Sequence, residues 1–61
     1  MSKKHALDRA ADAVGVMSQA IHDYGEHSPE ARGAVDAARD TFLVARAHGA
    51  TDDDLRDVHR A

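Results

Sequence analysis

The chain has 61 residues, no cysteine and a formal net charge of −3 with neutral histidines. A chain of this length forms a single domain with a small core, which no disulfide supports here; such domains commonly gain stability by oligomerising. No signal-peptide pattern opens the chain, and no uncharged run approaches the roughly 18 residues of a membrane span. We therefore expect a cytoplasmic homo-oligomer, most simply a dimer, that has no membrane partner.

The first predicted helix covers residues 3–24. Ser2 is a favourable N-cap, and Gly25 can supply the left-handed residue that follows a helix. Apolar residues recur between these ends at alternating spacings of three and four, which predicts a helix with one apolar seam. The seam consists of Leu7, Ala10, Val14, Met17, Ile21 and Tyr24. Three alanines at intervals of seven widen it, namely Ala6, Ala13 and Ala20.

The second predicted helix covers residues 29–48. Ser28 is its expected N-cap, Pro29 suits the first helical position, and Gly49 ends it. Its seam consists of Ala31, Val35, Ala38, Phe42 and Ala45. Since the connection between the two helices is short, they are expected to pack as an antiparallel hairpin.

The third predicted helix covers residues 52–60 and is short. Thr51 is its expected cap, and we interpret Asp52, Asp53 and Asp54 as first-turn residues that favour a helix N-terminus. They lack the alternating ligands, central glycine and terminal glutamate of an EF-hand loop.

Some apolar residues lie off the two seams and require a cover, which is either the third helix or a second subunit. Both alternatives are open at this point. The predicted interface residues are Leu43, Ala47, Leu55 and Val58. The predicted fold is all-α, with residues 1–61 as one helical domain: an antiparallel hairpin plus a short third helix, dimerising into an assembly like a four-helix bundle.

This outline of two capped, heptad-patterned helices is similar to that of the Rop-type plasmid copy-control proteins. The likeness is one of architecture over residues 3–49, with no shared motif, and assigns no residue a role. That family consists of homodimeric four-helix bundles that bind paired RNA loops, so the resemblance implies that a hairpin of this size can dimerise and function.

Catalysis and cofactor binding have no support in the sequence. No glycine-rich phosphate loop or paired-carboxylate motif is present, and a hairpin this small offers no deep pocket. His22 and Glu26 are four residues apart, but Gly25 separates them. His5, His48 and Asp52 would leave a zinc ion without a clear fourth ligand. We predict a protein that is not an enzyme and has no catalytic residue, cofactor or metal.

Three arginines repeat every seven residues along the second helix, at Arg32, Arg39 and Arg46. This arginine stripe is either a ridge that binds nucleic acid or a structural feature whose heads pair with carboxylates such as Asp36. The sequence around Gly49 is also compatible with a helix-turn-helix unit, but its recognition helix would begin with three aspartates that DNA phosphates repel.

We therefore expect a non-enzymatic helical module for protein–protein interaction, with a regulatory or accessory role. The partner is a second copy of the chain or another protein. The alternative is a small regulator that binds nucleic acid through the arginine stripe or a degenerate helix-turn-helix.

Overall fold

The computed structural model describes residues 2–60, with side chains described as far as Val58. This part of the chain is helical without strands, which confirms the all-α class. Helix α1 spans Lys3–Tyr24, α2 spans Pro29–Ala47 and α3 spans Asp52–Arg60. Helix α2 ends one residue earlier than expected because His48 takes the C-cap position.

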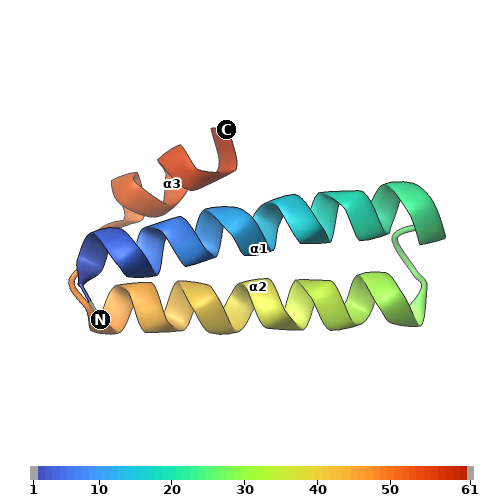
Figure 1. Cartoon of the computed structure of the whole chain (residues 1–61), viewed down its shortest axis with the longest axis horizontal. Coiled ribbons are helices and arrows are strands. Elements are labelled where there is room, and N and C mark those ends of the chain that lie inside the picture. The colour runs from blue at the N-terminus through green and yellow to red at the C-terminus, as the bar shows by residue number, and fades with distance from the viewer. Residues whose placement is uncertain (1, 61) are drawn as a thin grey trace.

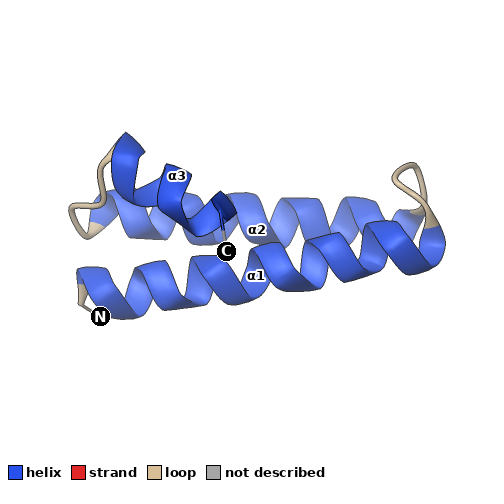
Figure 2. Ribbon diagram, turned by 90° about the horizontal axis from the view of Figure 1, so that it is seen from above, coloured by secondary structure: helices blue, strands red, loops and turns tan. Residues whose placement is uncertain are grey.

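Helices α1 and α2 lie side by side and run in opposite directions, joined by a short connection at one end of the molecule (Figure 1). Helix α3 turns back from the other end and lies over the N-terminal half of α1, so that the remaining half is uncovered (Figures 1 and 2). The described chain measures 33 × 18 × 15 Å.

Local capping fixes the ends of the two long helices. The hydroxyl of Ser2 accepts a hydrogen bond from the backbone N–H of His5 at 3.1 Å, and that of Ser28 accepts one from Ala31 at 3.1 Å. These bonds satisfy amides that the first helical turn leaves free. Gly25 follows α1 with a φ of 87°, a backbone conformation that glycine adopts without steric cost.

The corner between α2 and α3 is a Schellman turn centred on Gly49, whose φ is 96°. The backbone N–H of Ala50 donates to the carbonyl oxygen of Ala45 at 3.0 Å, closing the six-residue ring of that motif. Thr51 and Asp54 then cap α3 reciprocally: each side chain accepts from the other's backbone N–H, at 3.2 and 3.0 Å. The predicted capping role of Thr51 is confirmed.

Alanines form the line along which α1 and α2 touch. The buried residues of the pair are all small: Ala6, Ala10, Ala31, Ala38 and Ala45. Ala10 of the predicted α1 seam lies on this line, whereas Leu7, Val14 and Ile21 are only partly buried and Tyr24 is 61% exposed. Alanines at every seventh position allow the two backbones to approach closely, which leaves room for larger side chains only at the sides.

Candidate interaction surface

Helix α3 is held on the α1–α2 pair chiefly by Leu55. This side chain is 6% exposed and packs in one cluster with Ala6 and Ala45, one from each long helix. Leu7 and Phe42 are partly buried against the same cluster. Leu55 is the largest buried side chain among the described residues, so the contact of α3 is the nearest equivalent of a hydrophobic core.

Two ion pairs accompany this apolar contact. The guanidinium of Arg46 donates to Asp52 at 2.8 Å, and the ammonium of Lys3 lies 3.0 Å from the carboxylate of Asp54. The backbone N–H of Thr51, and secondly Lys3, lower the pKa of Asp54 below its ordinary value. The acidic first turn of α3 is thus matched by basic groups from both long helices.

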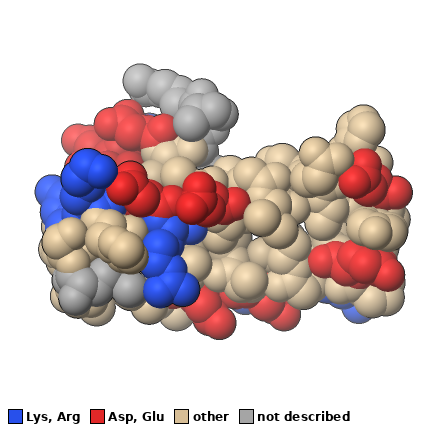
Figure 3. All heavy atoms as spheres, in the orientation of Figure 1, with Lys and Arg blue, Asp and Glu red and all other residues tan. Residues whose placement is uncertain are grey.

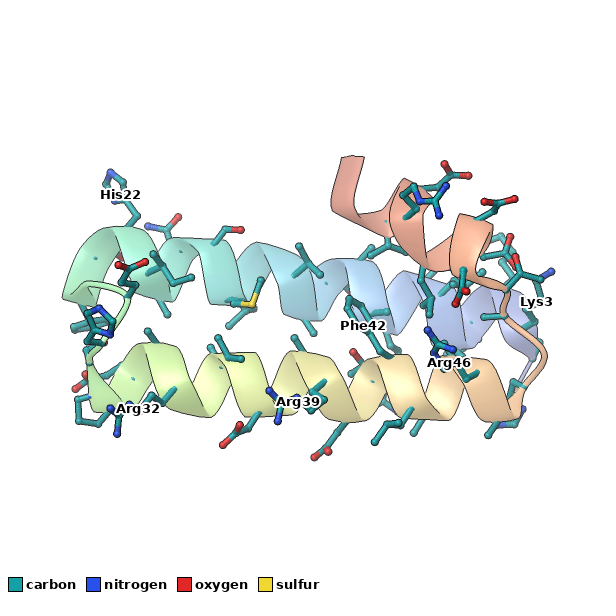
Figure 4. The ribbon with its side chains drawn as sticks, turned by 180° about the vertical axis from the view of Figure 1, so that it is seen from behind. Lys3, His22, Arg32, Arg39, Phe42 and Arg46 are labelled. Carbon is teal, nitrogen blue, oxygen red and sulfur yellow. The ribbon has the colours of Figure 1, made fainter. Side chains whose placement is uncertain are left out.

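The side of the pair that carries α3 extends well beyond α3 itself. Residues seven apart share a helix face. Leu7, which contacts α3, therefore shares its face with Val14 and Ile21, and Phe42 shares its face with Val35. We call this surface the α3 face, and it consists of Leu7, Val14, Ile21, Val35 and Phe42. Figure 4 views this side, with Phe42 directed between the long helices next to α3.

Part of the α3 face has no cover within the described chain. Leu7 and Phe42 lie in the cluster of Leu55, whereas Val14, Ile21 and Val35 are partly buried and are not part of that cluster. These three residues form the open half of the face, towards the connection between α1 and α2. Helices that bind in a groove place apolar side chains against partly exposed aliphatic residues of this kind.

The arginine stripe borders this face along α2 (Figure 4). Arg46 is engaged with Asp52, but Arg32 and Arg39 form no ion pair with any described residue. Asp36, the local partner that the spacing offered, pairs with neither of them in the described part of the chain. The open half of the face therefore has two unpaired cations at its edge.

The four predicted interface residues occupy different environments. Leu55 is buried in the chain's own core and Val58 is partly buried beside Leu7, while Ala47 is exposed. Leu43 is 60% exposed, because Leu55 packs on Ala6 and Ala45 and not over Leu43. Helix α3 is therefore not the cover that the sequence requires for Leu43.

The opposite side of the pair is a surface of a different kind. It has a shallow hollow lined by Ala6, Arg9, Asp40, Thr41 and Val44. Val16 lies on this side of α1, two residues and about 200° from Val14, and is 63% exposed. Figure 3, which looks from the side opposite to Figure 4, shows an uncharged area right of centre, bordered by charged side chains on the left, on the right and along the lower edge.

The histidines near the connection have local carboxylate neighbours. The imidazole of His22 lies 3.1 Å from Asp23, and that of His27 lies 3.4 Å from Glu26. A hydrogen bond from Gln19, and secondly His22, lower the pKa of Asp23. Among the described residues, no group of three histidine or acidic side chains is placed to hold a metal ion.

Comparisons with known proteins show no relative from which a role could be transferred. No protein-family model, curated protein or solved structure matches the chain. Within residues 2–60, no helix has the length and apolar character needed to cross a membrane. The function has to be inferred from the surface itself.

Sequence reasoning missed two parts of this surface. Lys3 was not recognised as a contact of α3, because it lies about fifty residues from Asp54 in the chain. Val14 and Val35 were assigned to the line between the helices and not to its side. The seven-residue repeat of Ala6, Ala13 and Ala20 was the available signal, since it defines a second possible contact line.

Proposed function

We propose that this protein is a non-enzymatic helical interaction module that functions as a homodimer. In the dimer, the open halves of two α3 faces pack together, so that two helical hairpins form an assembly like a four-helix bundle. A regulatory or accessory role in the cytoplasm is the biological setting that we infer for such a module.

The observation that carries this proposal is the absence of a core of large side chains within one chain. Apart from Leu55, the buried residues among those described are alanines. Fully burying one aliphatic side chain contributes about 1.5–3 kcal/mol, and the partly buried aliphatic residues of the α3 face have part of this stabilisation still to gain. A second copy would supply that burial.

A matched pair of substitutions tests the proposal. Val14→Asp places a charge on the open half of the α3 face, and Val16→Asp places the same charge on the opposite side of the same helix. We expect Val14→Asp to give a monomer and Val16→Asp to remain a dimer, measured by sedimentation equilibrium of the full chain. Dissociation by Val16→Asp alone would refute the assignment of the face.

A second candidate function is nucleic-acid binding, and the unpaired guanidiniums of Arg32 and Arg39 favour it. Phosphate groups could pair with both of them along one side of α2. The aspartates of α3 lie at the Arg46 end of the stripe and oppose such a ligand there. For this reason we place nucleic acid second.

Affinity for mixed duplex DNA and for RNA, measured at two salt concentrations, distinguishes the two functions. Nucleic-acid binding through the stripe requires affinity that falls steeply with salt and is lost when Arg32 and Arg39 are both replaced by glutamine. If the affinity for nucleic acid were unchanged by these replacements, the arginine stripe would be excluded as the nucleic-acid binding site.

A further inference from the structure

The group of residues that α3 contacts on the two long helices, which we call its seat, recurs one heptad further along the α3 face. The occupied seat contains two alanines, two larger apolar residues and one arginine: Ala6, Ala45, Leu7, Phe42 and Arg46. Because α1 and α2 are antiparallel, the equivalent positions lie seven residues later in α1 and seven earlier in α2. They carry the same types of residue: Ala13, Ala38, Val14, Val35 and Arg39.

No helix of the described chain fills this second seat. Ala13, Val14 and Val35 are partly buried and Arg39 is exposed without an ion pair to any described residue, while Ala38 is already only 3% exposed. The repeat stops there, because the next heptad of α2 has the capping residue Ser28 in place of Phe42 and Val35. The face therefore offers one additional seat, which lacks a counterpart of Lys3 because Ala10 stands seven residues later in α1.

The occupied seat indicates what kind of helix fits. Helix α3 presents Leu55 and Val58, three residues apart, and places an aspartate on the arginine of its seat. Its first turn and flank are strongly acidic, with aspartates at positions 52, 53, 54 and 57. The second seat offers partly exposed Ala13, Val14 and Val35 and an arginine of the same kind as Arg46, so an apolar side chain with a nearby carboxylate is complementary to it.

We propose that the second seat binds an acidic amphipathic helix of a partner protein. A leucine-sized side chain of the partner packs against Ala13, Val14 and Val35, and a carboxylate of the partner accepts hydrogen bonds from Arg39. Nucleic acid would satisfy Arg39 but leave Val14 and Val35 uncovered. A second copy's α3 is already engaged on its own chain. The inference rests on the interaction surface of the proposed function and names an occupant that competes with the second copy.

The experiment uses the full chain, labelled with ¹⁵N, and a synthetic peptide of residues 51–60 held helical by an internal cross-link. Amide shifts locate the bound peptide, and sedimentation equilibrium measures the mass in the same titration. We expect the largest shifts around Val14, Val35 and Arg39. Arg39→Glu should weaken binding at least tenfold, since it replaces a charge-assisted hydrogen bond by repulsion. Arg9→Glu, the same change on the opposite side, should leave the affinity unchanged.

Charge exchange provides a direct check of the contact. A peptide carrying Asp52→Lys should bind the Arg39→Glu chain more tightly than it binds the unaltered chain. Amide shifts confined to Ala6, Phe42 and Ala45 would mean that the peptide only replaces the chain's own α3, and this result would overturn the proposal. The proposal would also be overturned if the peptide did not bind, or if Arg9→Glu weakened binding as much as Arg39→Glu does.

The same titration separates this inference from the proposed homodimer. If the chain is a dimer, bound peptide should convert it to a monomer, because both occupants require Val14 and Val35. If the chain is a monomer throughout and the peptide still binds at the second seat, the homodimer fails and the acidic-helix site stands. If the chain is a dimer and the peptide does not bind to it, the homodimer stands and the acidic-helix site fails.

Discussion

The two halves of the α3 face are made of the same kinds of residue, yet the chain covers only one of them. At the α3 end, Ala6 is 1% exposed and packs in one cluster with Leu55 and Ala45. At the connection end, the equivalent Ala13 stays partly exposed beside Val14. The docked half forms a small core, and the open half has no cover within the described chain.

The difference arises from the length of α3 and from where the chain delivers it. The Schellman turn at Gly49 places the start of α3 next to the first seat. A helix of 9 residues then extends only about 14 Å, whereas the molecule is 33 Å long. Helix α3 therefore reaches one seat and leaves the other without a cover within the described chain.

Removing the anchor of the docked half should have the largest effect. Leu55→Ala deletes most of a buried side chain, for which the typical cost is about 2–5 kcal/mol. We expect α3 to lose its amide protection while α1 and α2 remain helical, measured by hydrogen exchange. The solvent-facing Leu43→Ala serves as the control and should change protection little. Retained protection of α3 in Leu55→Ala would contradict the assignment of the anchor.

Overpacking the contact line tests whether the alanines are what holds the two long helices together. Ala38 is 3% exposed, so Ala38→Leu forces α1 and α2 apart and should destabilise the chain by about 1–3 kcal/mol in urea unfolding. The neighbouring Ala37 is exposed, and Ala37→Leu should be close to neutral. Equal effects of the two substitutions would mean that the contact line lies elsewhere.

The capping of α3 by Thr51 should contribute less to the stability of the folded chain than the burial of Leu55 does. Thr51→Ala removes the hydroxyl that accepts from the Asp54 backbone N–H and should cost about 1 kcal/mol. Thr51→Ser keeps the acceptor and should restore most of that loss in urea unfolding. If serine behaved like alanine, the hydroxyl would not be the stabilising group.

Lowering the pH should reduce the stability of the docked half by less than any of the substitutions above. The fold lowers the pKa of Asp54, so the ionised carboxylate is favoured in the folded state. Its contribution is present above the ordinary aspartate pKa of about 4 and is lost as the pH falls through the lower folded value. The stability difference between the unaltered chain and Asp54→Asn should therefore shrink between neutral pH and about pH 2, and a constant difference would contradict this role.

The helix ends were predictable from sequence because their causes are local. Ser2, Ser28, Thr51 and the glycines each act within a few residues of the end that they define. The line of contact between α1 and α2 was harder to predict from sequence, because a regular pattern of large apolar residues suggests that these large residues lie between the helices. Four alanines of the predicted seams, Ala10, Ala31, Ala38 and Ala45, do lie on that line together with Ala6, whereas Val14 and Val35 are only partly buried at its side.

The candidate surface depended on contacts between distant parts of the chain. The seven-residue spacing of the arginine stripe was visible in the sequence, but the engagement of Arg46 by Asp52 depends on the direction in which α3 folds back. The same direction leaves Leu43 exposed and Leu55 buried, although both had been predicted at one interface.

The central claim is that the open half of the α3 face binds a second copy of the chain. Sedimentation equilibrium of the full chain over a concentration series tests it most directly. We predict a mass that approaches twice that of one chain as the concentration rises, with a helical circular dichroism spectrum in the same samples. A mass of one chain at every concentration, with the spectrum unchanged, would contradict the claim.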